Sequence, residues 1–211
     1  MVKNYVSNKD ETARMFKSNF MEALSKVHWT VPLYIYVPVV LACFYYAIFQ
    51  YSLGWGEIVL YLIAGILVWS FSEYTLHRFV FHFHATSDFG RRLTFIFHGV
   101  HHDYPNDSKR LVMPPSASIP LALLFFFLFL WLLGEVYVTP FFAGFIIGYL
   151  FYDITHYAIH HFNMKNKFWL AIKNHHMIHH YKYPNLGYGV SQPAWDYVFR
   201  TTYPKKDAVP E

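Results

Sequence analysis

The sequence is poor in charged residues. Only 14% of its 211 residues are Asp, Glu, Lys or Arg, whereas an ordinary soluble domain carries about 25%. Hydrophobic residues make up 55% of the chain and aromatic residues 22%. This composition argues against a soluble domain and predicts an integral membrane protein. The length suffices for one domain and hardly for two.

Cysteine is almost absent as well. Cys43 is the one cysteine, and it lies inside an apolar run. The sequence therefore excludes a disulfide framework and a thiolate metal site. Any metal that the chain binds must take nitrogen or oxygen ligands.

The N-terminus lacks the features of a secretory signal peptide. It has neither an apolar stretch after a charged start nor a cleavage site of small residues. Residues 1–30 are instead predicted to form a cytosolic arm, with an interfacial helix near residues 11–26.

Four apolar stretches follow, at about 31–53, 57–76, 117–134 and 136–155. Each has roughly the 17–25 residues that a membrane-spanning helix needs. Only a few residues join the first stretch to the second and the third to the fourth, so each pair is predicted to form a helical hairpin. The predicted fold class is all-α, with four transmembrane helices and a cytosolic helical cap.

The basic residues give the orientation. All 17 lie before the first stretch, between the second and third, or after the fourth, and they include Lys3, Lys205 and Lys206 near the termini. The positive-inside rule then places both termini and segment 77–116 on the cytoplasmic side. Residues 31–211 are predicted to be one membrane domain whose cap is formed by 77–116 and 156–211. The net charge of +4 follows from this topology, and no nucleic-acid partner is expected.

Histidine is abundant and clustered. Thirteen of the 14 histidines lie in two blocks, 77–102 and 156–180, and both blocks fall on the predicted cytoplasmic side. The spacing HxxHH occurs twice, and residues three and four apart share a helix face. His156 and His160 form a further pair four residues apart. His77 and His82 are five apart, a spacing that a helix accommodates by a slight turn of the face or a local distortion. The candidate metal ligands are His77, His82, His98, His101, His102, His156, His160, His176, His179 and His180.

A metal site explains this clustering better than chance. Ten buried imidazoles without partners would be costly, whereas a cation accepts their lone pairs. Ten nitrogens suit two metal ions with four or five ligands each, although their spacing does not choose among iron, copper, zinc and nickel. Of the remaining histidines, His28 is expected at the membrane interface, and His84, His161 and His175 are expected beside the ligands or in solvent.

Two carboxylates and several aromatic residues lie close to the histidines in sequence. Asp153 comes one turn before His156, and an acidic residue at this depth is a candidate functional residue. It either accepts a hydrogen bond from a ligand histidine or is a solvated helix-end charge, and Glu73 admits the same two interpretations. The aromatic residues either line an acyl channel or belong to ordinary membrane packing; they are Phe71, Tyr74, Phe79, Phe81, Phe83 and Tyr152.

Four sequence segments resemble the fatty acid hydroxylase superfamily. They are HRFVFH (77–82), HGVHHDYPNDSKRLVMPP (98–115), DITHYAIHH (153–161) and HHMIHHYKYPNLGYGVSQPAWDYVF (175–199). Within this superfamily the segments are most similar to the fatty acid 2-hydroxylases that act on sphingolipids. Many eukaryotic members carry an N-terminal cytochrome b5 domain, which an arm of about 30 residues cannot hold.

This resemblance implies an activity and its requirements. The activity is oxygen-dependent hydroxylation of a fatty acyl chain at C2, on ceramide or a fatty acid, with Asp153 and Tyr152 as catalytic candidates. The ten histidines match the family's ligand positions for two metal ions, expected to be Fe²⁺, although Zn²⁺ readily occupies such a site in purified protein. The other requirements are O2 and a separate electron carrier, cytochrome b5-like or ferredoxin-like. The expected location is a bacterial inner membrane or the endoplasmic reticulum.

Two other functions stay open at this point. One is a hydroxylase or desaturase of sterols or carotenoids, which share the histidine boxes. The other is a membrane metal-binding protein without catalysis. A metal transporter would place ionisable groups in mid-membrane, and the four apolar stretches have almost none.

Overall fold

The computed structural model describes residues 4–204, and these residues form helices and no strands. This confirms the all-α part of the predicted fold class. Lys3, Lys205 and Lys206, three of the basic residues that indicated the orientation, lie outside the described residues. In chain order, with η marking π-helix, the elements are α1 (Asn19–Leu24), α2 (Val31–Tyr45), η1 (Tyr46–Gln50), α3 (Trp55–Thr75), η2 (Leu76–Phe81), α4 (Asp88–Thr94), η3 (Phe95–Gly99), α5 (Val100–Asp103), α6 (Pro115–His161), α7 (Lys167–Tyr181) and α8 (Ala194–Val198).

Three helical stretches are long and apolar enough to cross a bilayer. They are α2 with η1 (Val31–Gln50), α3 with η2 (Trp55–Phe81), and α6 (Pro115–His161). The first two correspond to the predicted stretches 31–53 and 57–76. The third covers both remaining predicted stretches in one element of 47 residues.

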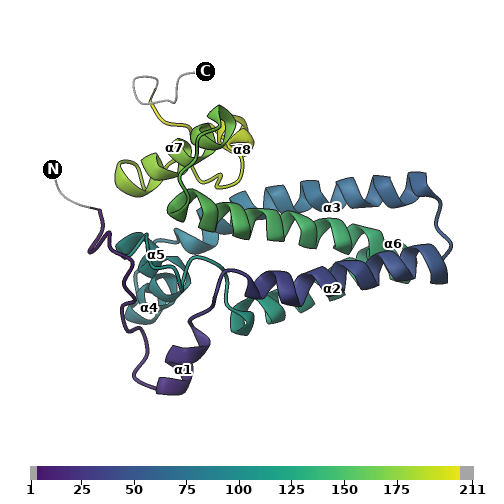
Figure 1. The fold of residues 1–211 in the computed structure, drawn as a ribbon, viewed down its shortest axis with the longest axis horizontal. Helices are drawn as coiled ribbons and strands as arrows, with labels where there is room; N and C mark the ends of the chain where they lie inside the picture. The colour runs from purple at the N-terminus through teal and green to yellow at the C-terminus, as the bar shows by residue number, and fades with distance from the viewer. Residues whose placement is uncertain (1–3, 205–211) are drawn as a thin grey trace.

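Helix α6 reverses its direction at Gly134. A straight helix rises 1.5 Å per residue, so Phe129 and Phe141 would lie about 18 Å apart along it. Their ring centroids are instead 4.8 Å apart, and those of Phe125 and Phe145 are 4.9 Å apart. Gly134 has φ 74°, in the left-handed region that glycine adopts without steric cost. The chain therefore has four apolar helical segments, and the two halves of α6 run side by side (Figure 1).

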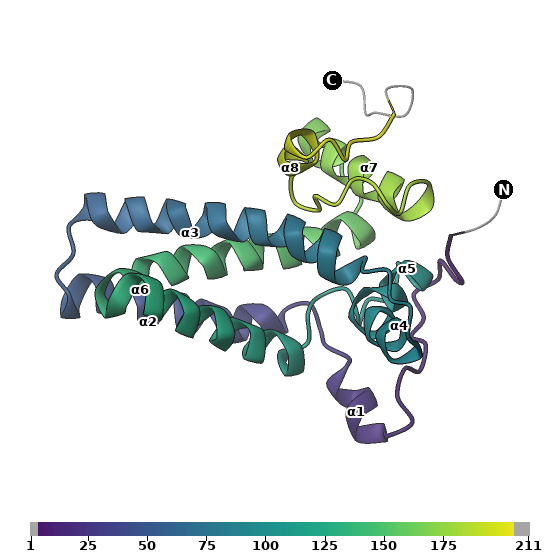
Figure 2. The same cartoon turned by 180° about the vertical axis from the view of Figure 1, so that it is seen from behind.

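The second half of α6 packs closely against α3. A Cβ atom built on Gly65 would lie 2.0 Å from the carbonyl oxygen of Phe141, and one on Gly144 would lie 2.0 Å from that of Leu62. The two glycines therefore let the helix backbones touch, which is a common arrangement between membrane helices. Figure 2 shows α3 lying along this half of α6 from the opposite side.

The remaining helices form a cap at one end of the helical bundle. We use "cap" for η2, α4, η3, α5, α7 and α8. Figure 2 shows α7 and α8 on one side of this end and α4 and α5 on the other. Since η2 continues α3 and α7 follows α6, the histidine blocks 77–102 and 156–180 meet where the cap adjoins the end of α6. Its cytosolic location stays a prediction.

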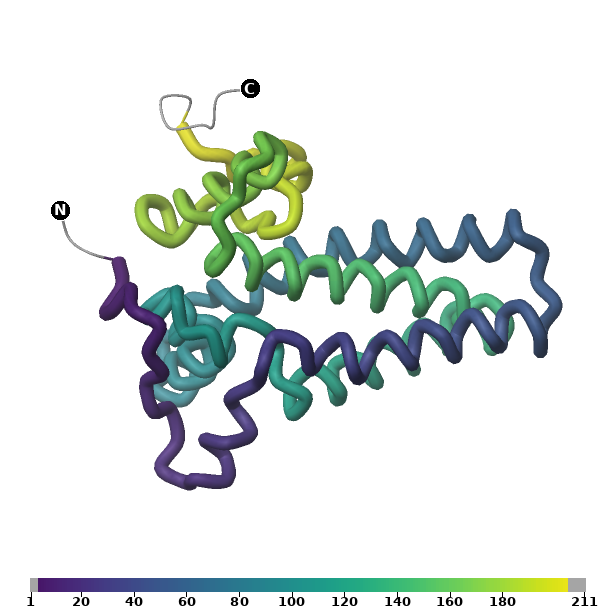
Figure 3. Tube along the Cα trace, viewed as in Figure 1, coloured from purple at the N-terminus to yellow at the C-terminus, as the bar shows by residue number. Residues whose placement is uncertain are grey.

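The N-terminal segment, residues 4–27, runs past α4 and α5 before the chain enters α2 (Figure 3). The amides of Val6 and Ser7 donate to the carbonyl of Asp103 at 2.9 and 3.1 Å. Only the short helix α1 forms where a longer helix, near residues 11–26, was predicted. It begins after Ser18, whose side chain accepts a hydrogen bond from the amide of Met21. The segment is therefore folded onto the cap over most of its length.

Candidate metal centre

The ten candidate histidines converge in two groups of five. We call His77, His82, His98, His102 and His179 the first group, and His101, His156, His160, His176 and His180 the second group. Within each group one ring nitrogen from every histidine lies within 4.8 Å of all the others. The fold thus brings together every histidine that the spacing singled out, with none of the other four in either group.

A π-helix accounts for the pair that is five residues apart. The amide of His82 donates to the carbonyl of His77 at 3.1 Å, which is the i to i+5 bond of a π-helix. This wider turn brings residues five apart onto one face. The Nε2 atoms of His77 and His82 are consequently 3.2 Å apart. The local distortion that the sequence allowed is therefore η2.

Each HxxHH box contributes to both groups. His98 and His102 enter the first group, with Nε2 atoms 3.1 Å apart, while His101 enters the second. In the box His176–His180 the assignment to the two groups is reversed. His176 and His180 enter the second group, with Nε2 atoms 3.0 Å apart, and His179 enters the first.

Two backbone carbonyls fix the orientation of first-group rings. His77 Nδ1 lies 2.6 Å from the carbonyl oxygen of Tyr188, and His179 Nδ1 lies 2.8 Å from that of Leu186. A carbonyl only accepts, so each Nδ1 donates its proton and each Nε2 keeps its lone pair for the centre of the group. Histidines that bind metal are typically held in this way.

The burial of the rings keeps them neutral. Desolvation is the main cause that lowers the pKa of His82 to about 4 and that of His179 to about 3, with neighbouring histidines adding to the effect. The pKa values of His98 and His176 fall well below the usual range for the same reasons. A neutral imidazole is the form that ligates a metal.

The donor set fits two metal ions. Five mutually close ring nitrogens cannot all be satisfied by hydrogen bonds to one another, since a neutral imidazole has a single N–H. In the second group, both ring nitrogens of His160 are buried and have no hydrogen-bond partner. A cation within each group would take up these lone pairs. All-imidazole sites suit iron, copper, zinc or nickel.

A buried carboxylate holds the loop that supplies the two carbonyls. Asp196 accepts hydrogen bonds from the amides of Tyr188 and Gly189 at 2.9 and 2.8 Å and from the Thr201 hydroxyl at 2.7 Å. His175 Nε2 lies 3.1 Å from the same carboxylate. Burial alone would raise the pKa of Asp196, but these hydrogen bonds outweigh it and lower the pKa.

Asp196 was not among the candidate residues predicted from the sequence. No spacing relates it to the histidines, although it lies in the segment GYGVSQPAWDYVF that carries part of the family resemblance.

Glu73 holds the same loop from the side of α3. Its carboxylate accepts hydrogen bonds from the amides of Val190 and Ser191 at 2.9 and 2.8 Å and from the Ser191 hydroxyl at 2.5 Å. Of the two interpretations of Glu73, the structure shows neither a histidine partner nor a solvated charge among the described residues. Glu73 instead ties α3 to the loop beside His77.

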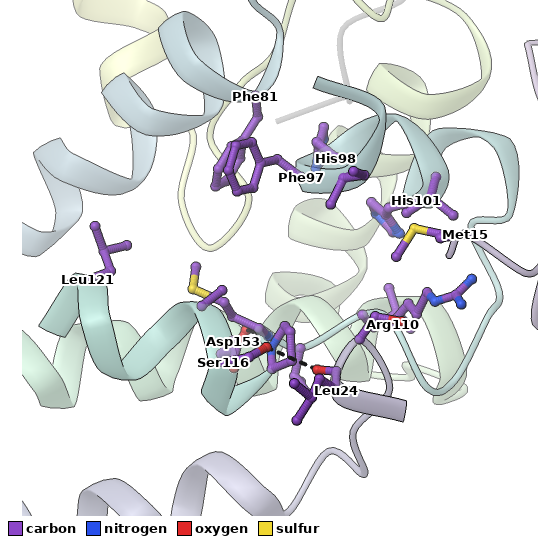
Figure 4. A pocket seen from close by; sticks show the side chains of 18 of the residues that line it. Met15, Leu24, Phe81, Phe97, His98, His101, Arg110, Ser116, Leu121 and Asp153 are labelled. Atoms are coloured by element: carbon purple, nitrogen blue, oxygen red, sulfur yellow. Dashed lines mark hydrogen bonds between the residues drawn. The ribbon is translucent and has the colours of Figure 1, made fainter. Parts of the chain in front are cut away.

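A cavity of about 530 Å³ adjoins both groups (Figure 4). His98 of the first group and His101 and His156 of the second lie in its wall, which is otherwise mostly apolar. Among the aromatic residues proposed for an acyl channel, Phe81 and Tyr152 line this cavity. The others do not line it: Phe71, Tyr74, Phe79 and Phe83.

The two catalytic candidates lie in the cavity wall. The ring of Tyr152 is stacked near that of His156, with centroids 5.8 Å apart. Asp153 is buried and accepts hydrogen bonds from the amide of Met113 at 3.2 Å and the hydroxyl of Tyr149 at 3.0 Å. The hydrogen-bond partners of Asp153 are therefore Met113 and Tyr149, whereas one interpretation of the sequence had been a bond to a ligand histidine.

The four other histidines lie outside both groups. His28 and His84 are exposed, and His28 Nδ1 lies 2.8 Å from the Thr30 hydroxyl. The ring of His161 stacks on Tyr157 with centroids 4.6 Å apart, and His175 is the partner of Asp196.

Comparison with known proteins places this arrangement in a family. The family of fatty acid hydroxylases matches residues 62–201. The chain is 38% identical over 199 residues to dihydroceramide fatty acyl 2-hydroxylase FAH1 of Arabidopsis thaliana, covering 90% of this chain and 80% of the relative. It is 38% identical over 216 residues to fatty acid 2-hydroxylase of Mus musculus, covering 92% of this chain and 57% of the relative.

A solved structure agrees with the sequence comparisons. It is described as full-length scs7p with only the hydroxylase domain visible, and it superposes with a TM-score of 0.84 at 35% identity. The match covers 92% of this chain and 73% of the other. The resemblance carried by the four histidine-rich segments is thereby confirmed: the chain is an oxidoreductase that belongs to the fatty acid hydroxylase family.

Proposed function

We propose that this enzyme hydroxylates C2 of the acyl chain of a ceramide or related sphingolipid. The observation that carries the proposal is the apolar cavity whose wall contains histidines of both groups. An acyl chain in this cavity would lie beside both candidate metal positions, out of contact with water. The names of the relatives, dihydroceramide fatty acyl 2-hydroxylase and fatty acid 2-hydroxylase, support C2 as the position.

The reaction requires a metal, oxygen and electrons. One oxygen atom of O2 replaces the C–H bond at C2 with C–OH, and the other leaves as water with two protons and two electrons from an external carrier. Two Fe²⁺ ions, held by the first and second groups, would supply the activation of O2. Zn²⁺ binds such nitrogen ligands more tightly than Fe²⁺ does, so purified protein would need iron to be active.

The side chains of the cavity would perform the remaining tasks. The apolar wall excludes water and aligns the acyl chain, and alignment of reacting groups lowers the barrier of a reaction. Tyr152 and Asp153 lie beside His156 in this wall, where they would contact the lipid next to the reacting carbon. The hydrogen bonds from Met113 and Tyr149 fix the Asp153 carboxylate in that position.

We place the four apolar helical segments across the membrane, with the cap and both histidine groups on the cytoplasmic side. The distribution of basic residues supports this orientation. An electron carrier, cytochrome b5-like or ferredoxin-like, would then reach the cap from the cytoplasm.

The function is tested with iron-loaded enzyme in lipid nanodiscs. N-stearoyl ceramide, isotopically labelled O2 and a reduced ferredoxin are added, and the product is analysed by mass spectrometry with fragmentation. We expect one labelled oxygen atom at C2 of the acyl chain. A product hydroxylated at another carbon, or turnover of a sterol or carotenoid but no acyl lipid, would overturn the proposal.

A further inference from the structure

The N-terminal segment is fastened to the cap by buried charged groups. Glu22 on α1 accepts hydrogen bonds from the amides of Met15 and Phe16 at 2.9 and 3.0 Å, which folds the segment back on itself. The same carboxylate lies 2.6 Å from the guanidinium of Arg110, and both side chains are buried. Arg110 also donates to the carbonyl of Ala13. These bonds hold residues 13–22 in one defined position.

This position makes the N-terminal segment part of the cavity wall. Met15 and Phe16 line the cavity from the stretch before α1, and Met21 and Leu24 line it from α1 itself. Figure 4 shows Met15 and Arg110 at one end of the cavity and Leu24 beside Ser116. The Ser116 hydroxyl donates to the carbonyl of Leu24 at 3.0 Å and so joins α1 to the start of α6.

The exposed part of the cavity wall is apolar. Of the residues that line the cavity, seven are exposed: Met21, Leu24, Val80, Phe97, Ser116, Pro120 and Leu124. Ser116 is the polar member, and its hydroxyl is bonded to Leu24. Leu124 is 65% exposed and Phe97 53%, so large apolar side chains remain uncovered in this part of the wall. We call this exposed part of the wall the opening of the cavity. An opening of this kind suits a lipid, which would pass it without leaving an apolar environment.

The opening lies at the level where the bundle meets the cap. Leu124 and Pro120 belong to the apolar first half of α6, whereas the cavity ends at the histidines of the cap. Figure 3 shows α1 below the first turns of α2 and α6, on the outside of the molecule. In the orientation proposed above, α1 would lie at the membrane interface.

From these contacts we propose that α1 forms one side of the opening through which the lipid substrate reaches the histidines, and that Met21 and Leu24 determine which acyl lipids pass. The proposal rests on the proposed function, since it assigns a substrate path to the same cavity. The Glu22–Arg110 pair positions this side of the opening.

The first experiment measures selectivity. Met21→Trp narrows the opening, whereas Phe20→Trp places the same bulk on the neighbouring residue, which does not line the cavity and is 71% exposed. We compare kcat/KM for N-lignoceroyl and N-hexanoyl ceramide. The ratio of long-chain to short-chain kcat/KM should fall about tenfold in Met21→Trp and stay unchanged in Phe20→Trp. A loss of fold or metal would reduce kcat/KM for both substrates by the same factor and leave their ratio unchanged. An unchanged ratio in Met21→Trp would therefore overturn the proposal.

The second experiment does not depend on turnover. Met21→Cys and Phe20→Cys are labelled with a maleimide in nanodiscs with and without N-stearoyl ceramide, and the wild-type chain, whose Cys43 is buried, serves as the blank. Ceramide should slow the labelling of Met21→Cys but not that of Phe20→Cys. Protection at Met21→Cys without any hydroxylation by the wild type would refute the proposed function and leave the substrate path standing. Equal labelling of both variants, with and without ceramide, would refute the path even in an active enzyme.

Discussion

At the scale of single residues, helix geometry explains why each HxxHH box divides between two groups. With 3.6 residues per turn, His180 is rotated about 40° from His176, and His179 is rotated about 60° to the other side. The i and i+4 rings therefore aim at one centre, and the i+3 ring aims at its neighbour. The spacing was enough to select the ten histidines. It was not enough to divide them, because the division depends on where η2, η3, α6 and α7 meet in space.

The division gives a prediction for metal content. His156 and His160 belong to the second group alone, so replacing both with Ala should reduce bound metal from about two ions per chain to about one. His84→Ala is the matched control, since His84 is exposed and outside both groups, and it should keep both ions. Elemental analysis of the purified variants provides the measurement. An unchanged metal content in the double variant would contradict the assignment of these two residues as ligands.

Asp196 leads to a second prediction at this scale. Its carboxylate accepts four hydrogen bonds, and Asp196→Asn replaces one acceptor oxygen with a donor that faces other donors. A buried group left unsatisfied costs about 1–3 kcal/mol, so the thermal midpoint should fall. The first group should also bind metal more weakly, since the loop carries the carbonyls of Tyr188 and Leu186. Thermal unfolding and metal titration test both effects, with the exposed Asp88→Asn as control; a variant as stable as the wild type would count against this role.

Asp196 and Glu73 show where sequence reasoning stops. Both carboxylates act through backbone amides of residues 188–191, and an amide is present at nearly every position of a chain. The acceptors of the histidine rings are likewise backbone carbonyls. Such partners have no residue-type pattern, so they become visible only once the loop has been placed.

At the scale of helices, the predicted segments agree well with the structure because their causes are local. Long apolar runs determine α2, α3 and both halves of α6, and Gly134 permits the reversal between those halves. The π-helix η2 was only partly predictable. The five-residue spacing of His77 and His82 required a distortion, but only the fold shows that the distortion is an i to i+5 hydrogen bond.

The contact between α3 and α6 gives a prediction for this scale. Gly144→Ala would place a methyl group 2.0 Å from the carbonyl oxygen of Leu62, so the two helices must separate. Overpacking of this kind costs about 1–3 kcal/mol. Gly56→Ala is the control, because its added Cβ has no atom within 4 Å. We expect a lower thermal midpoint and reduced activity for Gly144→Ala alone; equal midpoints for the two variants would contradict the close packing.

At the scale of the whole molecule, the N-terminal segment differs most from its prediction. Residues 1–30 were expected to be an arm with an interfacial helix. In the described part, from residue 4, only α1 is helical, and the segment crosses the cap and lines the cavity. Its anchors, Asp103, Asp107 and Arg110, are about 90 residues away in sequence, and local periodicity carries no information about contacts at such a separation.

The attachment of this segment should depend on pH through Glu22. Burial alone would raise the pKa of Glu22, but hydrogen bonds from Lys26 and from the amides of Phe16 and Met15, together with the charge of Arg110, lower it from 4.5 to about 2. A lowered folded-state pKa means that the ionised carboxylate stabilises the fold above pH 4.5 and that this stabilisation disappears as the pH falls towards 2.

The test compares the wild type with Glu22→Gln, which cannot ionise. The difference between their thermal midpoints should be largest near neutral pH and should shrink below pH 4.5, and other titrating groups cancel in this difference. Glu11→Gln, at an exposed position of the same segment, should match the wild type throughout. A midpoint difference that does not change with pH would show that the charge of Glu22 is not what fastens the segment.

Two helices that contribute histidines to both groups have a consequence for how the protein takes up metal. Helices α5 and α7 each supply histidines to both groups, whereas η2 serves only the first group and α6 only the second. An ion held by the first group would fix His179 on α7. Because His176 and His180 lie on the same helix, they would then be held in place for an ion in the second group. Loading should therefore be cooperative, and native mass spectrometry during titration with limiting metal should find mainly chains with no ion or two ions. The enzyme would then pass from empty to complete with few half-loaded chains, in which a single redox ion would be left open to oxygen.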